Sequence, residues 1–315
     1  MMGRKEAVDG TLENDSDYFV TVDSPLHLNC LRFCHKFPVV NDRDADMDIA
    51  FTLVVHKDLS QIAHLLRMIY RKNNYYCTHT DLRSDQHFVD ALNGIAQCYG
   101  SNVELVPLSQ RVKVNWGDES VLLPQPICGA HALRRHFFRK TLKALNDSNL
   151  IESLSIDEYK GWVGDAKLPL GATWFEGSIY SAYRREFLEE GILGGKVEPI
   201  RSAIVKHKSF KHPDELFFPT LAYNLHLKLP GACLTSPSLS SEVRMNFLGK
   251  YVIRTGYDLP CNTKFGKEHI SLLKRAPHIS ANKFHADYEQ EAYDEMKRWY
   301  FGKMLAVKKQ RLCHL

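Results

Sequence analysis

The chain has 315 residues, of which 44% are hydrophobic, and its 41 basic and 37 acidic side chains leave a formal charge of +4. This length and apolar content suffice for one large α/β domain or two small ones, which excludes a disordered protein. The nearly balanced charge argues against a nucleic-acid-binding protein. No run of about 18 apolar residues occurs and the first residues lack a signal-peptide pattern, so we expect neither a membrane-spanning segment nor a signal peptide in this sequence.

The composition predicts three regions. Residues 1–48 are polar and predict a tail or stem remnant with a lead-in loop, residues 49–305 predict the folded domain, and residues 306–315 predict a C-terminal tail. Two sequons make Asn14 and Asn146 candidate glycosylation sites.

Eight cysteines are scattered along the chain without a C-x-x-C pair, which argues against a zinc knuckle or a redox motif. Dispersed pairs are typical of disulfides in a lumenal compartment. Cys30, Cys34 and His35 could together be offered as metal ligands, but no second cluster matches them. We therefore predict disulfides and no metal site.

Residues 49–81 predict a strand–helix–strand unit around which the rest is organised. The apolar run 49–55 is typical of a parallel strand covered on both faces, and Asp58 can cap the helix that follows. The β-rich run 75–80 predicts a second strand, parallel to the first. Asp81 would then lie at the carboxyl end of a strand, where open α/β sheets bind ligands and a carboxylate can accept hydrogen bonds from a ribose or uracil ring. It could equally only begin the next turn.

The next segments continue this alternation. Ser84 predicts the cap of a helix, and residues 102–106 predict a third strand. The resulting βαβαβ order is that of a nucleotide-binding half-domain. Neither G-x-G-x-x-G nor a P-loop is present, which argues against dinucleotide-binding proteins and triphosphate hydrolases.

Further along, residues 130–145 predict a basic helix with a solvated face, and residues 168–180 predict a glycine-rich loop that lets a ligand approach the backbone. Another helix is predicted from Tyr183. Asp214 and Glu215 follow a proline and precede an apolar helical run, so they are predicted at a helix start. The last predicted helix packs through one face, made of Tyr288, Ala292, Met296, Trp299 and Tyr300.

Several segments together resemble the core-2/I-branching β-1,6-N-acetylglucosaminyltransferases, the family that also includes the peptide O-xylosyltransferases. They occur in family order, and the ordered set is more specific than any one of them. The matching segments are FTLVVHKD to CTHTD at 51–81, IAQC to NV at 95–103, VNWGDES at 114–120, WFEGSIYSAYRREF at 174–187, HPDE at 212–215, LPGA at 229–232 and SANKF at 280–284.

The resemblance implies a GT-A-type α/β fold, with a Rossmann-like nucleotide-sugar half and an acceptor-binding half. It implies inverting transfer of N-acetylglucosamine from UDP-GlcNAc to the 6-hydroxyl of galactose or N-acetylgalactosamine in glycoprotein O-glycans. No cofactor or metal is expected, because basic side chains replace the D-x-D-held metal ion. The resemblance also implies a type II membrane glycoprotein of the Golgi apparatus, attached there only if an anchor precedes this chain.

The resemblance also implies roles for individual residues. Glu215 matches the general base, Lys283 the lysine that contacts the donor diphosphate, and Asp81 the uridine-side carboxylate. The second diphosphate cation could be Lys267 or Arg254, or be absent. The remaining matches are Val54, Val55 and His56 in the nucleotide pocket, Gly177 and Ser178 near donor and acceptor, and Asp214 beside the base. Family spacing pairs Cys77 with Cys128, and Cys98 with Cys30 or Cys34.

The chain departs from the family pattern between Trp116 and Trp174. A central strand and turn expected there are absent, and the interval is about thirty residues short. Two alternatives therefore stay open: a non-catalytic or truncated member that binds a glycan or a partner, and an enzyme similar to the peptide O-xylosyltransferases. The retained Glu215, Lys283 and Asp81 favour an active transferase.

Overall fold

The computed structural model describes residues 17–36, 49–135, 149–151, 160–207, 210–232, 250–251, 264–278, 280–285 and 288–312. The chain divides into two compact units, residues 1–113 and 114–315, and each has its own hydrophobic core. The candidate glycosylation sites Asn14 and Asn146 lie outside the described residues, as does Arg254.

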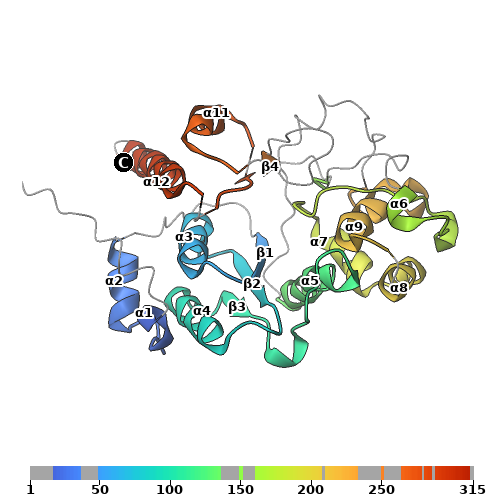
Figure 1. Ribbon diagram of the computed structural model, residues 1–315, viewed down its shortest axis with the longest axis horizontal. Coiled ribbons are helices and arrows are strands. Elements are labelled where there is room, and N and C mark those ends of the chain that lie inside the picture. The colour runs from blue at the N-terminus through green and yellow to red at the C-terminus, as the bar shows by residue number, and fades with distance from the viewer. Residues whose placement is uncertain are drawn as a thin grey trace, which may run out of the picture. The chain divides into compact units, whose positions relative to one another are not determined.

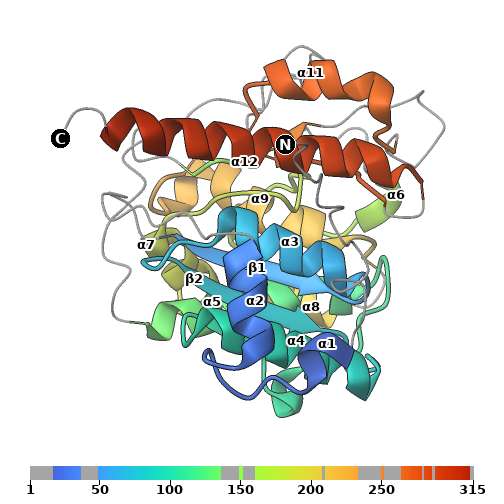
Figure 2. The same cartoon turned by 90° about the vertical axis from the view of Figure 1, so that its left-hand side faces the viewer.

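The first unit is an α/β unit built on a parallel three-stranded sheet of order β1-β2-β3. Its elements in chain order are α1 (Asp17–Val20), α2 (Leu28–Lys36), β1 (Ala50–Val55), α3 (Leu59–Ile69), β2 (Tyr75–Thr80), α4 (Gln86–Tyr99), β3 (Val103–Leu105) and the short 3-10 helix η1 (Leu108–Gln110). Figures 1 and 2 show α3 and α4 side by side on one face of the sheet. This arrangement follows from two successive right-handed crossovers, and it confirms the predicted βαβαβ order.

The expectation that β1 is covered on both faces is wrong. Positions along β1 alternate between exposed and half-buried, whereas every residue of β2 is buried. Within the described residues, β2 pairs on both sides and β1 on one side only, so the apolar run at 49–55 forms an edge strand of this sheet.

The helix starts differ from two predicted caps. Asp58 occupies the N-cap position of α3, but its side chain makes no cap hydrogen bond. The cap of α4 is Asp85, not Ser84, and its carboxylate accepts hydrogen bonds from the backbone N–H groups of His87 and Phe88. A single carboxylate oxygen, Oδ1, accepts from both of these otherwise unpaired helix donors.

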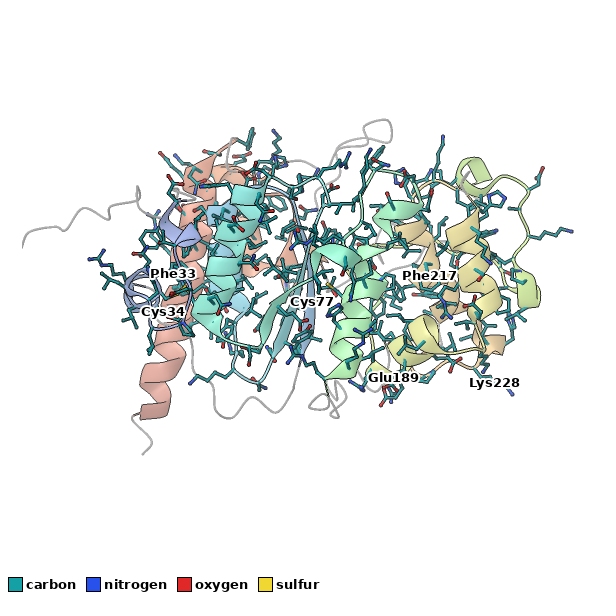
Figure 3. All side chains as sticks on the ribbon, turned by 90° about the horizontal axis from the view of Figure 1, so that it is seen from below. Phe33, Cys34, Cys77, Glu189, Phe217 and Lys228 are labelled. Carbon is teal, nitrogen blue, oxygen red and sulfur yellow. A yellow bond between two sulfur atoms is a disulfide. The ribbon has the colours of Figure 1, made fainter. Side chains whose placement is uncertain are left out.

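One disulfide anchors α2 to α4 within the first unit. Cys30 is bonded to Cys98, 68 residues along the chain, which confirms one of the two predicted pairings. Cys34, one helical turn after Cys30, keeps a free, half-buried thiol whose pKa is raised by burial. It lies next to Phe33 on α2 (Figure 3). Cys77 and Cys128 are also disulfide-bonded.

Close packing around Gly94 joins α1 to α4. A Cβ atom at this position would overlap the backbone carbonyl of Phe19, which is fully buried. Only glycine allows the two helices to approach this closely. The polar N-terminal region was predicted to be a tail, but its residues from Asp17 onward already contribute to the core of this unit.

The second unit consists mainly of helices. Its elements are η2 (Glu119–Val121), α5 (Pro124–Arg134), α6 (Lys160–Val163), η5 (Pro169–Gly171), α7 (Arg185–Leu188), η6 (Glu189–Leu193), α8 (Glu198–Lys206), α9 (Pro213–Tyr223), η7 (Leu225–Leu227), β4 (Lys250–Tyr251), η8 (Lys267–His269), α11 (Ile270–Arg275), β5 (Ser280–Ala281) and α12 (Gln290–Leu312). The main core surrounds α9, where Phe217, labelled in Figure 3, is 1% exposed. A smaller cluster packs α11 against α12 through Phe265, Leu273 and Ala292.

Several predicted boundaries in this unit shift. The basic helix expected at 130–145 is α5, which starts earlier, with Pro124 in its first turn, and ends at Arg134, whereas residues 136–148 lie outside the described part. The helix expected from Tyr183 begins at Arg185, since Tyr183 itself packs on the core. Tyr288 precedes the last helix. The helix at 213, with proline in its first turn, is confirmed.

No helix in the described residues combines the length and the apolar character needed to cross a membrane.

Candidate active site

The carboxyl edge of the sheet in the first unit gathers four of the predicted residues. The strand register pairs Val54 with His79 and Val55 with Thr80. His56 and Asp81 directly follow these pairs, so they lie beside each other where β1 and β2 end. The half-exposed Val54 and the exposed His56 leave this edge accessible. The predicted nucleotide-side residues are thus brought together by strand pairing.

Asp81 is held by the turn that it begins. Arg83 forms a two-pronged ion pair with its carboxylate, with Nε at 2.9 Å from Oδ1 and Nη2 at 2.8 Å from Oδ2. The backbone N–H of Arg83 also donates to Oδ1, at 2.7 Å. Asp81 thus lies at a strand end, as predicted, and also organises the turn that follows, whereas its predicted role toward a nucleotide stays a prediction. Its carboxylate is fixed in orientation while its remaining lone pairs can accept further hydrogen bonds.

His79 lies near the carboxyl end of β2, and its imidazole is neutral at physiological pH. Burial and then the positive charge of Arg111 lower its pKa to about 4, and the charge of Asp81 only partly opposes this shift. Its Nε2 accepts a hydrogen bond from the backbone N–H of Val112, at 3.3 Å. The histidine thus pins the segment after η1 to the sheet and adds no charge at neutral pH.

In the second unit, the glycine-rich loop runs along α9 and is bonded to it at regular intervals. The Asn224 side chain accepts from the N–H of Thr173, at 2.8 Å, and donates to the carbonyl of the same residue, at 2.7 Å. One turn earlier on α9, the Thr220 hydroxyl accepts from the N–H of Phe175, at 3.1 Å. The buried side chains of Thr220, on α9, and Asn224, directly after it, thereby satisfy backbone hydrogen-bonding groups of the loop.

A further hydrogen bond joins the loop to Glu215, on the first turn of α9. The backbone N–H of Gly177 donates to the Glu215 carbonyl at 2.8 Å. That carbonyl lacks its usual helical donor, because position i+4 is Pro219, which has no N–H. A proline inside α9 therefore leaves an acceptor that binds the loop. Gly177 is thus bonded to the backbone of Glu215, with Ser178 next to it in the chain, while their predicted place near donor and acceptor stays a prediction.

The start of α9 is set by His212. Its backbone adopts a left-handed conformation (φ 51°), and its N–H donates to the carbonyl of Gly117 at 3.0 Å. The imidazole lies between Trp116 and Trp162, with both ring centroids at 4.6 Å. Burial, and then the charge of Lys211, lower the His212 pKa, which favours the neutral ring in this aromatic setting. Sequence reasoning quoted this histidine only as part of a motif and missed its role.

The two carboxylates after Pro213 have different surroundings. Asp214 is 7% exposed, and burial raises its pKa to about 6 although backbone N–H groups of Asp214 and Glu215 bond to it. Its Oδ1 has no hydrogen-bond partner among the described residues. Glu215 is half-buried on the same turn. Glu215 is therefore the more accessible of the two carboxylates, whereas Asp214 is enclosed.

Lys283 and Lys267, the predicted contacts to the donor diphosphate, differ in whether a carboxylate already pairs with them. Lys283 follows β5, and its carbonyl accepts from the N–H of Phe265 at 2.8 Å. No carboxylate among the described residues forms an ion pair with its ammonium group. Lys267, in contrast, forms ion pairs with Glu289 and Glu291, and these charges contribute to raising its pKa. Among the described residues, the ammonium group of Lys283 therefore has no carboxylate partner that an anion would have to displace, whereas that of Lys267 has two.

Tyr180 joins this group, although the sequence marked it only as part of the glycine-rich loop 168–180 and of the matching segment 174–187. Its hydroxyl accepts a hydrogen bond from Nδ2 of Asn282, at 3.3 Å, which brings the loop after Gly177 next to Lys283. No cluster of three or more His, Cys, Asp or Glu side chains in the described residues is arranged to hold a metal ion.

The fold and these residues define an α/β protein with a parallel three-stranded sheet and polar side chains at its carboxyl edge. The sequence model described as "Core-2/I-Branching enzyme" matches residues 49–142, a range that includes all three strands of this sheet.

Relatives extend the match over most of the chain. "Beta-1,3-galactosyl-O-glycosyl-glycoprotein beta-1,6-N-acetylglucosaminyltransferase 4" of Mus musculus is 30% identical over 335 residues, which cover 89% of this chain and 70% of the relative. The similarly named transferases of Bos taurus and Homo sapiens are 22% and 23% identical, covering 83% and 79% of this chain and 72% and 69% of the relatives. The chain belongs to the core-2/I-branching enzyme family.

Proposed function

We propose that the chain is an inverting β-1,6-N-acetylglucosaminyltransferase that acts on glycoprotein O-glycans and needs no metal ion. The names of its relatives support the reaction, which would move N-acetylglucosamine from UDP-GlcNAc to the 6-hydroxyl of galactose or N-acetylgalactosamine. The observation that carries the proposal is the half-buried Glu215 on the first turn of α9, whose backbone binds the Gly177 loop.

In this proposal Glu215 is the general base. An acceptor hydroxyl is a weak nucleophile at neutral pH, so its proton must leave as its oxygen attacks the anomeric carbon. The new C–O bond forms on one face of the sugar while the bond to UDP breaks on the other, which inverts the configuration. Asp214 is less suited to this role, because its side chain is enclosed and Glu215 is the more exposed of the two carboxylates.

Lys283 would stabilise the leaving UDP. Breaking the sugar–phosphate bond places an additional negative charge on the diphosphate, and a direct ammonium contact can stabilise it. The support for this role is that Lys283 is half-buried and that no described carboxylate neutralises it. Asp81, Val54, Val55 and His56 would hold the nucleoside at the sheet edge. Lys267 would first have to give up its own carboxylate partners.

The proposal includes a GT-A-type fold and a Golgi location. The parallel sheet with its polar carboxyl edge supports the fold. The buried Cys30–Cys98 disulfide supports an oxidising compartment, since such bonds are rare in the cytosol.

A transfer assay on the purified chain tests the proposal. UDP-GlcNAc would be offered with core-1 and poly-lactosamine acceptors, with and without EDTA, and UDP-xylose with a serine-containing peptide would be offered in parallel. We expect a β-1,6-linked N-acetylglucosamine product whose rate EDTA does not change, because Lys283 and not a metal ion meets the phosphate charge. UDP binding without transfer would identify a non-catalytic member, and xylose transfer would identify a peptide xylosyltransferase. Activity restored only by manganese would contradict the mechanism.

A further inference from the structure

A side-chain hydrogen bond joins two segments that carry different parts of the proposed chemistry. Nδ2 of Asn282 donates to the Tyr180 hydroxyl at 3.3 Å, across a sequence separation of 102 residues. Asn282 directly precedes Lys283, and Tyr180 lies three residues after Gly177. The bond therefore connects the proposed diphosphate lysine to the loop beside the proposed base.

On the Tyr180 side, hydrogen bonds fix the loop at residues 177–181. Gly177 is bonded to the Glu215 carbonyl, as described above, and the Ser178 hydroxyl accepts from the N–H of Tyr180 at 3.2 Å. Ser181 closes the turn by donating from its hydroxyl to the Ser178 carbonyl at 2.9 Å. Tyr180 therefore follows a turn that is closed by its own hydrogen bonds and is tied to α9 through Gly177.

The lysine side is held through its backbone. The N–H of Asn282 donates to the carbonyl of Tyr251 at 3.1 Å, and the carbonyl of Lys283 accepts from Phe265 at 2.8 Å. These bonds set the position of the segment relative to β4 and η8. The Asn282 side chain, in contrast, reaches out to the α9 region through Tyr180.

The tyrosine hydroxyl is protonated at neutral pH, because the ordinary pKa of tyrosine is about 10. Burial, and then the negative charges of Glu215 and Asp214, raise its pKa. A protonated phenol can accept from Asn282 and still donate its own proton. The ring remains 43% exposed, so it is not simply a member of the core.

We propose that Tyr180 is a positioning residue that acts through Asn282 to hold Lys283 at the distance from Glu215 that donor binding and transfer require. This inference rests on the proposed function. It assigns the hydroxyl to donor binding and not to the proton transfer carried out by Glu215.

The test compares Tyr180→Phe, Asn282→Ala and the double variant with the parent chain. Tyr180→Phe removes only the hydroxyl, so the dissociation constant for UDP, measured by calorimetry, should rise by about 2- to 10-fold, the effect of losing one hydrogen bond. If the two residues act as one unit, the double variant should bind UDP no more weakly than the weaker single variant. Tyr223→Phe is the matched control, because it removes a hydroxyl of the same unit that is bonded to the carbonyl of Ile151 at 3.0 Å.

Four outcomes would overturn the inference. Unchanged UDP affinity in Tyr180→Phe would show that the hydroxyl does not position Lys283, and additive effects of the two single variants would show that it does not act through Asn282. A shift in the acidic limb of the pH profile of kcat would assign the hydroxyl to the base instead. Failure of the parent chain to bind UDP would overturn the proposed function itself, and this inference with it.

Discussion

The backbone carbonyl of Glu215 accepts a hydrogen bond from the N–H of Gly177 at 2.8 Å, in place of the helical bond that Pro219 cannot make. The proline is therefore part of the site, although its side chain need not contact a substrate. It keeps one acceptor of α9 available for the loop that carries Gly177 and Ser178.

Replacing Pro219 by alanine should loosen this loop. The new N–H of Pro219→Ala would compete with Gly177 for the Glu215 carbonyl, so the amide of Gly177 should exchange faster in native-state hydrogen exchange. Pro213→Ala is the matched control, since a proline in the first turn replaces a donor that has no helical acceptor. Equal exchange at Gly177 in both variants would show that the proline does not control the loop.

Glu215→Gln should abolish most of the turnover. Glutamine keeps the shape of the side chain but cannot accept the proton, so kcat should fall by about 10²- to 10⁴-fold while the UDP dissociation constant stays nearly unchanged. Glu198→Gln is the control, because Glu198 also lies on the first turn of a helix, α8. If both variants turn over at the parent rate, Glu215 acts only as a helix-start carboxylate.

Lys283→Ala should weaken donor binding. A charge-assisted contact to phosphate is worth about 1.5–3 kcal/mol, so the UDP dissociation constant should rise by about 10- to 100-fold. Lys274→Ala removes a lysine that is instead paired with Glu295 at 2.6 Å, and it should bind UDP as the parent does. Calorimetry with UDP measures both, and equal affinities would exclude Lys283 from the diphosphate site.

Asp214→Asn should change how stability depends on pH. Burial raises the Asp214 pKa from 3.8 to about 6, so between these values the folded chain binds more protons than the unfolded chain. The free energy of unfolding of the parent therefore falls as the pH rises through about 6. Asparagine does not titrate, so the variant should gain about 2–3 kcal/mol relative to the parent between pH 4 and pH 7.5.

Urea unfolding of the Asp214 variant at both pH values measures this difference, with Asp165→Asn, an exposed aspartate of the same unit, as the matched control. A gap between parent and Asp214→Asn that does not change with pH would contradict the assignment.

Cys98→Ser should destabilise the chain by about 2–4 kcal/mol, because it opens a covalent loop in the unfolded state. Cys34→Ser leaves the Cys30–Cys98 bond intact and should have a much smaller effect. Peptide mapping without reduction should recover Cys30 linked to Cys98 and Cys34 alkylated. Recovery of Cys34 linked to Cys98 would contradict this pairing.

Local sequence patterns were enough to predict much of the architecture. Alternating strands and amphipathic helices at 49–106, the proline before Asp214 and Glu215, and the strand-end position of Asp81 were all found as predicted. These features depend on periodicity, on backbone restrictions of single residues and on the short connections between neighbouring elements, all of which act over a few residues.

Other features depend on residues far apart in the chain, and no local pattern encodes them. Cys30 and Cys34 lie on the same face of α2, and the packing of that helix on α4 selects Cys30 as the partner of Cys98. The exposed positions along β1 depend on which elements cover each face of the sheet, and the apolar run at 49–55 does not encode this. The bond between Tyr180 and Asn282 exists because the loop on α9 and the segment after β5 meet in space. Such contacts are set by the geometry of packed elements, which becomes defined only once the chain has folded.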